Sequence, residues 1–183
     1  CGMPLGPLTL YDVVGLDTAF YAGQVMHDAF PDRIVAAPVL DAMVKAGRLG
    51  QKSGAGFYKY GNDKKGRGEP DPSVNELLAP HIKPAGAKLS AEHITDRLFL
   101  PMVLEATRIL AEKKVRDARD VDLGLIFGTG FPPFKGGLLF WADTIGAAKI
   151  VERLKPYEAL GARYRPTPML LDLAKRGGTF YAG

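Results

Sequence analysis

The amino-acid sequence predicts a mostly α-helical fold made of two related helical units in tandem. Three observations lead to this prediction. Apolar residues recur at helical spacing over much of the chain. The strand-like stretches, residues 56–60 and 179–181, are too short and too isolated to build a sheet. One pattern of Gly, Pro, Asp, Phe and Tyr also occurs twice in the same order, which is typical of an internal repeat.

The clearest helix is predicted over residues 90–114. Apolar residues fall on one face of it at every fourth position, namely Ile94, Leu98, Met102, Ala106 and Leu110. Ser90 is placed to cap the amino end of this helix. Pro101 removes one backbone donor from the middle, which costs about 3 kcal/mol, so we expect a kink there or two helices in close succession.

Shorter helices are predicted at residues 16–30, 39–45, 73–78, 118–127, 144–154 and 167–174. Between residues 60 and 72 the chain is rich in Gly, Pro and charged residues, a composition that is typical of linkers. The predicted domains are therefore a first repeat at residues 1–60, a linker at 61–89 and a second repeat at 90–183.

Each repeat has a Gly/Pro turn, then an apolar stretch with Asp-x-x-Gly, and finally Lys-x-Gly-x-x-Phe-Tyr. These are residues 2–7, 12–15 and 52–58 in the first copy and 130–137, 143–146 and 175–181 in the second. We expect Asp12 and Asp143 to cap the next helix or to hold the turn. The Phe-Tyr pairs are expected to dock a short terminal strand on the helices.

The two repeats differ in length at their front. The second begins with the long helix at residue 90, roughly forty residues ahead of its turn, whereas the first has only Cys1 ahead of its turn. The expectation is that the chain is a fragment that begins inside its own first repeat.

Composition argues against several other classes of protein. The net charge is +4 and the pI is near 9.1. Its densest basic cluster is Lys64, Lys65 and Arg67; a solvated loop is favoured there over a nucleic-acid or phosphate patch, because no aromatic residues interleave with the charges. Since no apolar run approaches the ~18 residues needed to cross a bilayer, no membrane span is predicted. The single cysteine fits a reducing compartment, and a cytoplasmic location is predicted.

The usual catalytic and metal-binding side chains form no cluster in the sequence. His27, His81 and His93 have no second ligand at metal-binding spacing, and Cys1 has no histidine partner to activate it. No catalytic residue and no metal ligand is therefore expected in this chain.

Two long motifs, residues 2–17 and 47–58, closely resemble the C-terminal domain of 3-hydroxyacyl-CoA dehydrogenases. Residues 96–106 and 128–137 look like a second copy of that domain. Two copies in tandem are a mark of the multifunctional fatty-acid oxidation proteins. The resemblance implies a helical domain like the C-terminal domain of 6-phosphogluconate dehydrogenase.

The resemblance also implies a reaction, the NAD-dependent oxidation of an L-3-hydroxyacyl-CoA in fatty-acid β-oxidation. In that family the catalytic His, its carboxylate and the Gly-rich dinucleotide loop belong to a preceding Rossmann domain. No complete Rossmann domain is expected here, because Gly128-Thr-Gly130 is followed by Phe-Pro-Pro, which cannot open a helix at a pyrophosphate. We therefore predict that NAD serves the parent enzyme, and that this fragment alone binds no cofactor and is inactive.

The resemblance suggests where substrate contacts lie. The first Gly/Pro turn lies near the acyl-CoA cleft in the family, so Pro4, Leu5, Gly6 and Pro7 are the predicted substrate-binding residues, with shaping of the core as the competing interpretation. Asp96 takes the place of a substrate-binding polar residue and is expected to have kept only a packing role.

Three hypotheses about function stay open at this stage. The first is the helical part of the dehydrogenase, with its two units packed face to face as a covalent pseudodimer, acyl-CoA as substrate and a thiolase subunit as a candidate partner. The second is a free-standing acyl-CoA-binding or scaffold module that assembles with a separate catalytic chain. The third, a nucleic-acid binder, is supported by the charge alone.

Overall fold

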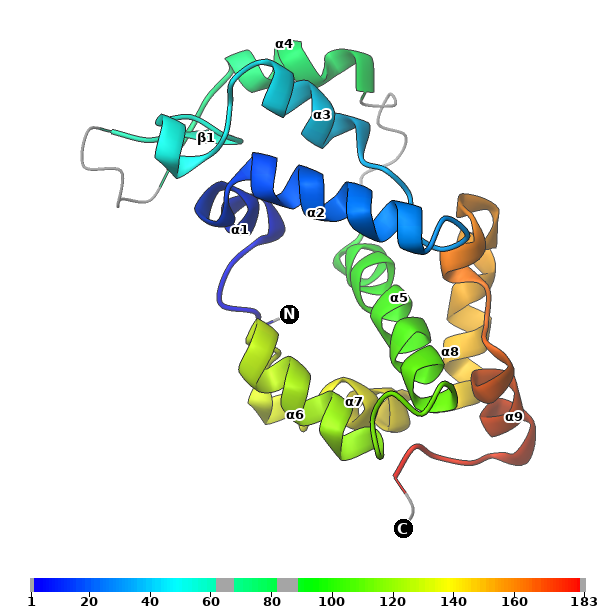
Figure 1. Cartoon of the computed structure of the whole chain (residues 1–183). Helices are drawn as coiled ribbons and strands as arrows, with labels where there is room; N and C mark the ends of the chain where they lie inside the picture. Colours follow the sequence, from blue (N-terminus) through cyan, green and yellow to red (C-terminus); the bar gives the residue numbers. More distant parts are fainter. Residues whose placement is uncertain (1, 62–67, 82–88, 182–183) are drawn as a thin grey trace. The chain divides into compact units, whose positions relative to one another are not determined.

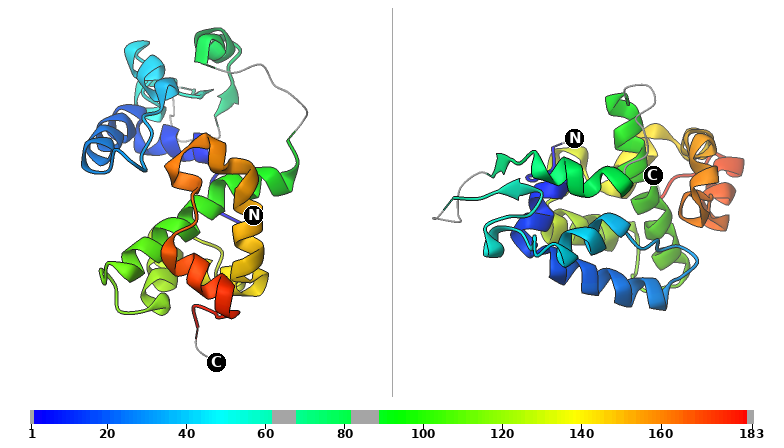
Figure 2. Two further views of the ribbon diagram at one scale, coloured as in Figure 1. Left: turned by 90° about the vertical axis from the view of Figure 1, so that its right-hand side faces the viewer. Right: turned by 90° about the horizontal axis from the view of Figure 1, so that it is seen from above.

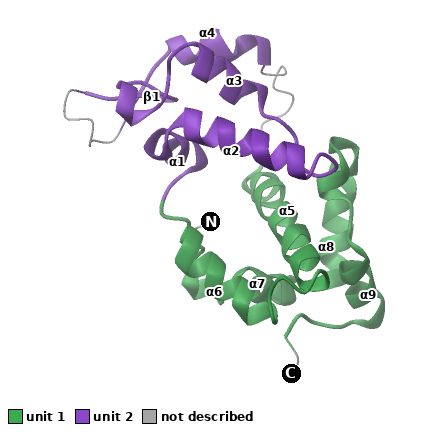
Figure 3. Cartoon of the chain, in the orientation of Figure 1, with its two compact units in different colours: residues 1–4, 89–183 green, residues 5–88 purple. Residues whose placement is uncertain are grey.

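The structure, a computed structural model, describes residues 2–61, 68–81 and 89–181 (Figure 1). It divides into two compact units, each treated by itself below. Unit 1 comprises residues 1–4 and 89–183, and unit 2 comprises residues 5–88 (Figure 3). The described residues form mainly helices, so the predicted mostly α fold is confirmed.

Unit 2 contains four α-helices and one small pair of strands in its described part. The helices are α1 (Pro7–Val14), α2 (Leu16–Ala29), α3 (Pro38–Lys45) and α4 (Ser73–Leu78), with 3-10 turns η1 (Gln51–Ser53) and η2 (Ala79–His81). Strand β1 (Tyr58–Lys59) pairs antiparallel with β2 (Glu69–Pro70), so that Tyr58 lies opposite Pro70 and Lys59 opposite Glu69.

The core of unit 2 is small. It consists of side chains from α2, α3, α4 and the segment before β1, namely Leu16, Leu40, Met43, Phe57, Val74 and Leu78. Val74 and Leu78 come from the segment that the sequence marked as a linker, because α4 has an apolar face that packs onto α3. The boundaries 1–60, 61–89 and 90–183 stay a prediction.

Unit 1 is built around its longest helix. The α-helices are α5 (Ala91–Ala111), α6 (Ala118–Thr129), α7 (Leu138–Ile145), α8 (Ala147–Leu154) and α9 (Pro168–Arg176), with 3-10 turns η3 (Pro133–Lys135), η4 (Lys155–Leu160) and η5 (Ala162–Tyr164). Helix α5 packs against α7, α8, α9 and η5 (Figure 2). Its residues Leu100, Val103 and Leu104 are fully buried at the centre of the core.

Pro101 lies inside α5, and the helix continues through it. Of the two predicted alternatives, two successive helices is therefore wrong, and a kink at Pro101 stays a prediction. A proline leaves the carbonyl four residues earlier without its helical donor. Here that carbonyl belongs to Arg97, and the Tyr164 hydroxyl donates to it at 3.2 Å. The amino end of α5 is as predicted, since the N–H of His93 donates to Ser90 Oγ at 3.1 Å.

Three local predictions need correction. Residues 144–154 do not form one helix, because Gly146 has a φ of +89° that ends α7 and starts α8. Helix α1 was missed as a separate element for the same reason, since Gly15 has a φ of +99°. Residues 179–181 form no strand. Within 56–60 only Tyr58–Lys59 form a strand, β1, and its pairing with β2 shows that this stretch is not isolated as expected.

Candidate functional site

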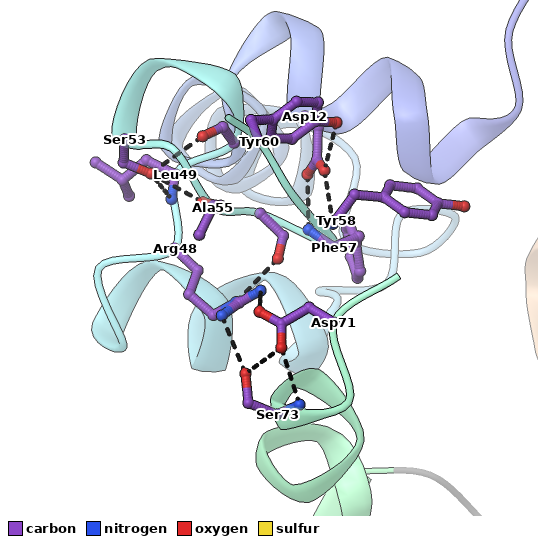
Figure 4. A network of polar contacts seen from close by, with 12 residues as sticks. Asp12, Arg48, Leu49, Ser53, Ala55, Phe57, Tyr58, Tyr60, Asp71 and Ser73 are labelled. Atoms are coloured by element: carbon purple, nitrogen blue, oxygen red, sulfur yellow. Dashed lines mark hydrogen bonds and ion pairs between the residues drawn. The ribbon is translucent and has the colours of Figure 1, made fainter. Parts of the chain in front are cut away.

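A buried carboxylate holds the Phe-Tyr segment of unit 2. Asp12 on α1 is only 1% exposed. Its carboxylate accepts the backbone N–H of Phe57 at 2.8 Å and that of Tyr58 at 2.9 Å, and the Tyr60 hydroxyl also donates to it, at 2.9 Å (Figure 4). These contacts join residues more than forty positions apart in the chain. We call this arrangement the carboxylate clamp.

Unit 1 contains a second carboxylate clamp, formed by the two backbone bonds. Asp143 on α7 accepts the N–H of Phe180 at 2.9 Å and that of Tyr181 at 3.0 Å. In both units Oδ1 of the aspartate accepts from the Phe and Oδ2 accepts from the Tyr. The repeat detected in the sequence is thus a repeat of hydrogen bonding.

The clamp corrects the role expected for the two aspartates. Gly15 and Gly146 are the N-cap residues of α2 and α8, and no side-chain hydrogen bond caps either helix. The aspartates instead bind the end of their own repeat. Phe57 lies in the core of unit 2, and Phe180 and Tyr181 pack on the core of unit 1, as expected. The second pair does so without forming the expected strand.

Glycine beside the clamp lets the backbone approach the carboxylate in unit 2. A Cβ built on Gly56 would overlap the Asp12 carboxylate. The matching position in unit 1 is Thr179, so this close approach belongs to unit 2 alone. The Gly56 carbonyl is held as well, because Arg48 Nε donates to it at 2.9 Å.

Two tyrosines near the clamps are fixed as donors. Burial raises the pKa of Tyr60, and its hydrogen bond to Asp12 raises it further. Burial likewise raises the pKa of Tyr181, followed by its hydrogen bond to Asp122. Neither phenol is suited to release a proton near neutral pH, so the geometry favours a structural role over acid–base chemistry.

Asp122 on α6 is a further buried carboxylate, and sequence reasoning missed it. It is 2% exposed and accepts the N–H of Leu139 at 2.7 Å, that of Phe140 at 3.0 Å and the Tyr181 hydroxyl at 2.7 Å. The first turn of α7 is therefore capped from a neighbouring helix. The available signal was an Asp within the apolar run 121–127.

A second polar network ties α4 to the loop before β1 (Figure 4). Arg48 Nη2 lies 2.8 Å from Asp71 Oδ2, and Ser73 donates its N–H at 3.0 Å and its hydroxyl at 2.8 Å to Asp71 Oδ1. The bonds from Ser73 and then those from Arg48 lower the pKa of Asp71 to about 2. This network was also missed, because its partners come from separate parts of the sequence.

The four predicted substrate-binding residues fall in different units. Pro4 belongs to unit 1, where its ring lies against Gly130. Leu5, Gly6 and Pro7 belong to unit 2; Leu5 is 43% exposed, and Gly6 and Pro7 start α1. Their contact with substrate stays a prediction.

Unit 2 contains a hollow of about 570 Å³. Leu8, the residue that follows the predicted substrate-binding turn, lies in its lining. Its apolar lining comes from α1, α3, α4 and the segment before β1, and includes Leu8, Tyr11, Leu40, Phe57, Val74 and Leu78. This volume lies in the range of small-molecule sites, which are mostly apolar with a few polar groups.

Two of the three histidines have ordinary structural contacts, and His81 is an exposed residue at the end of η2. His27 Nδ1 lies 2.8 Å from the Ile34 carbonyl, and His93 lies 3.3 Å from the Tyr157 hydroxyl. No group of three or more His, Cys, Asp or Glu side chains that could hold a metal occurs among the described residues. The remaining predicted positions, Cys1, Lys64, Lys65 and Arg67, lie outside the residues that the structure describes.

Asp96 is 5% exposed and is paired with Arg153, whose guanidinium nitrogens lie 2.6 and 3.1 Å from the carboxylate oxygens. The pair ties α5 to α8. This supports the packing role that the resemblance implies for Asp96.

The described residues do not fit a dinucleotide. A Rossmann site needs a parallel strand, a Gly-rich turn and the amino end of a helix. The strands described here are two residues long and antiparallel, and Gly130 ends α6. That the chain binds no NAD stays a prediction. In the described part of the chain, no helix is long and apolar enough to cross a membrane.

Comparison with known proteins identifies the first repeat. Residues 1–60 match the profile of the family described as "3-hydroxyacyl-CoA dehydrogenase, C-terminal domain". Residues 1–60 belong to this family. The resemblance inferred from residues 2–17 and 47–58 is thereby confirmed.

Two curated proteins match the chain beyond its first repeat. The fatty acid oxidation complex subunit alpha of Pseudomonas savastanoi pv. phaseolicola is 43% identical over 184 residues, which cover 98% of this chain and 25% of that subunit. The subunit of the same name from Pseudomonas aeruginosa (strain UCBPP-PA14) is 42% identical over the same length, covering 98% of this chain and 26% of the relative. The chain thus spans about a quarter of the length of these relatives.

The fold is also found in a solved dehydrogenase. The crystal structure of 3-hydroxybutyryl-CoA dehydrogenase from Escherichia coli K12 matches with a TM-score of 0.67 at 21% identity, covering 96% of this chain and 52% of that one. At this identity the likeness shows the fold alone.

Proposed function

We propose that this chain is the helical part of an NAD-dependent L-3-hydroxyacyl-CoA dehydrogenase of fatty-acid β-oxidation. The observation that carries the proposal is the identity of 43% over 98% of the chain to a fatty acid oxidation complex subunit alpha, together with the family match of residues 1–60. In this proposal the helical units shape the acyl-CoA cleft and form the core of a pseudodimer. Residues outside this chain bind NAD and carry out the chemistry.

In this proposal the chain's own residues build the helical scaffold and hold its segments in place. The two clamps hold the ends of both repeats, and the Asp122 cap fixes the first turn of α7, by buried or part-buried hydrogen bonds. Both raised tyrosine pKa values and the absence of a metal cluster among the described residues agree with a scaffold rather than a reacting centre.

A chimera tests the proposal most sharply. Residues 1–183 would replace the matching segment of the Pseudomonas savastanoi subunit, and dehydrogenase activity would be measured with acetoacetyl-CoA and NADH. We expect the chimera to be active and the isolated chain to show no turnover. A folded but inactive chimera, or an isolated chain that turns over at an ordinary enzymatic rate, would contradict the proposal.

The predicted substrate turn is tested in the same chimera. Leu5 is exposed and apolar, so Leu5→Asp places a charge where an acyl chain is proposed to lie. We expect a higher KM for long-chain substrates, with a smaller effect on short ones. Leu171→Asp, at an equally exposed position on α9, is the matched control and is expected to leave both KM values unchanged. An unchanged KM for Leu5→Asp would remove the turn from the substrate site.

Calorimetric titration of the isolated chain with CoA thioesters separates this function from a free-standing acyl-CoA-binding module. The proposal expects weak binding at most, since the Rossmann side of the cleft lies outside this chain. Tight binding by the isolated chain would favour the module instead. Association with a thiolase subunit is a further proposal, tested by co-purification with the chimera.

A further inference from the structure

Helices α5 and α6 of unit 1 border a hollow of about 420 Å³ (Figure 1). This volume lies in the range of small-molecule sites. Most of the lining is apolar, and these side chains belong to the core of unit 1 or pack against it, so the walls are held in place. They are Met102, Ala106, Ile109, Val115, Val121 and Leu125.

Gly124 keeps this hollow open. It lies inside α6 and in the lining, and a Cβ built on it would meet no atom within 4 Å. Glycine inside a helix is less favourable than alanine, so neither the helix nor close packing requires a glycine here. A larger side chain at this position would take up space in the hollow.

Two carboxylates line the hollow, and each is paired with an arginine. Arg108 Nη1 lies 2.9 Å from Glu105 Oε2. Arg116 donates to the Asp120 carboxylate through Nε at 2.8 Å and through Nη2 at 2.7 Å. Because each negative charge lies beside a positive one, these pairs add no net charge to the hollow.

A second hollow adjoins the first at the connection from α5 to α6, since Val115 and Asp120 line both. Its lining includes Lys113 and Lys114, which are both exposed. Lys113 has a φ of +54°, a left-handed conformation that glycine usually supplies at the end of a helix. Glu112, the carboxylate before them, is in neither lining. This end of the combined hollow is therefore basic.

We propose that the α5–α6 groove, defined as these two adjoining hollows, binds a linear aliphatic carboxylate. The apolar wall follows α5 from Met102 to Ile109 for about 10 Å, which suits an extended chain. The ligand carboxylate then lies at the basic end, beside Lys113 and Lys114. A nucleotide head group is disfavoured, because the lining has no aromatic side chain on which a base could stack. The site lies in unit 1 and does not depend on the function proposed above.

Decanoate is the probe for this groove. It would be titrated into the full chain with carbon-13-labelled methionine methyl groups. We expect a saturable shift of the Met102 signal and no shift of Met43, which lies in the core of unit 2. Decyltrimethylammonium has the same chain with the opposite charge, and it is expected to bind about tenfold more weakly. No saturable shift of Met102, or equal binding of the two compounds, would overturn the proposal.

Two glycines of α6 provide a matched pair of variants. Gly124→Leu fills the groove and is expected to weaken decanoate binding, measured by calorimetry, more than roughly tenfold. Gly128→Leu adds the same side chain at another position of α6 with open space around its Cβ, outside the lining, and should leave the affinity unchanged. Equal effects of the two substitutions would contradict the proposed site.

The lysines are tested without altering the packing of the groove. Lys113→Gln/Lys114→Gln changes only exposed side chains, and we expect it to weaken decanoate binding about fivefold. Binding of 1-decanol, which is uncharged, should be the same in this variant and in wild type. An equal loss for both compounds, or no loss for decanoate, would remove the carboxylate from the basic end. Decanoyl-CoA binding that is tighter than decanoate binding would overturn the assignment to a carboxylate.

Discussion

The carboxylate of Asp12 accepts the backbone N–H of Phe57 at 2.8 Å, although 45 positions separate the two residues in the sequence. The bond is buried, and it closes the first repeat on itself. Asp143 and Phe180 form the same bond at 2.9 Å in the second repeat. The same hydrogen bond therefore joins the Asp-x-x-Gly motif to the Phe-Tyr pair in each repeat.

Removing this carboxylate is expected to destabilise unit 2. Asp12→Ala leaves the Phe57 N–H, the Tyr58 N–H and the Tyr60 hydroxyl without their acceptor, so we expect the free energy of unfolding to fall by roughly 3 kcal/mol. Urea denaturation measures the change. Asp41→Ala, which breaks an exposed pair with Lys45, is the control and should cost under about 1 kcal/mol. Equal losses in the two variants would contradict the burial argument.

A pair of glycine substitutions should act in opposite directions. Gly56→Ala forces a methyl group onto the Asp12 carboxylate, so we expect a loss of about 1–3 kcal/mol from overpacking. Gly23→Ala lies within α2 with open space around its Cβ position, and it should gain about 0.5–1 kcal/mol from helix propensity. Thermal unfolding of both variants checks the signs, and a stabilising Gly56→Ala would show that the close approach is absent.

The Arg48–Asp71–Ser73 network should weaken in acid. The pKa of Asp71 in the folded chain is lowered from 3.8 to about 2, so its contribution to stability is complete above the ordinary pKa and is lost as the pH falls toward 2. We expect the difference in urea midpoint between wild type and Asp71→Asn to be constant near neutral pH and to shrink between about pH 4 and pH 2. A difference that is unchanged at pH 2 would exclude this linkage.

Alkaline pH should act through Tyr60, which is buried, and Tyr181, which is partly buried. The folded chain holds Tyr60 and Tyr181 protonated, because burial and their carboxylate partners raise both pKa values above the ordinary 10.0. Their contribution to stability is present below that value and is lost as the pH rises above it. The double variant Tyr60→Phe/Tyr181→Phe should therefore lose less stability than wild type above pH 10. Tyr21→Phe, at an exposed position, is the control whose pH profile should match wild type.

The repeat was predictable because its residues are spaced alike in both copies. Helix α5 was predictable from its apolar spacing, and its cap from Ser90. The continuation of α5 through Pro101 was one of two alternatives, because the Tyr164 hydroxyl that donates to the Arg97 carbonyl is distant in the sequence.

The clamp could be anticipated only in part. The Asp-x-x-Gly spacing indicated that the aspartate has a structural role. An aspartate just before a helix is expected to bond to nearby backbone, as a cap of that helix or in the turn. Its observed partners lie at the far end of the repeat. Asp122 was harder still, since an Asp in a helix is most often solvated and only packing shows it to be buried.

Native-state hydrogen exchange of four amides tests the central claim that Asp12 and Asp143 close the two repeats independently. We predict that the amides of Phe57, Tyr58, Phe180 and Tyr181 are all protected in the wild-type chain. Asp12→Asn should then release only the first two, and Asp143→Asn only the last two. Unprotected amides in the wild type, or protection that survives the matching substitution, would contradict the account.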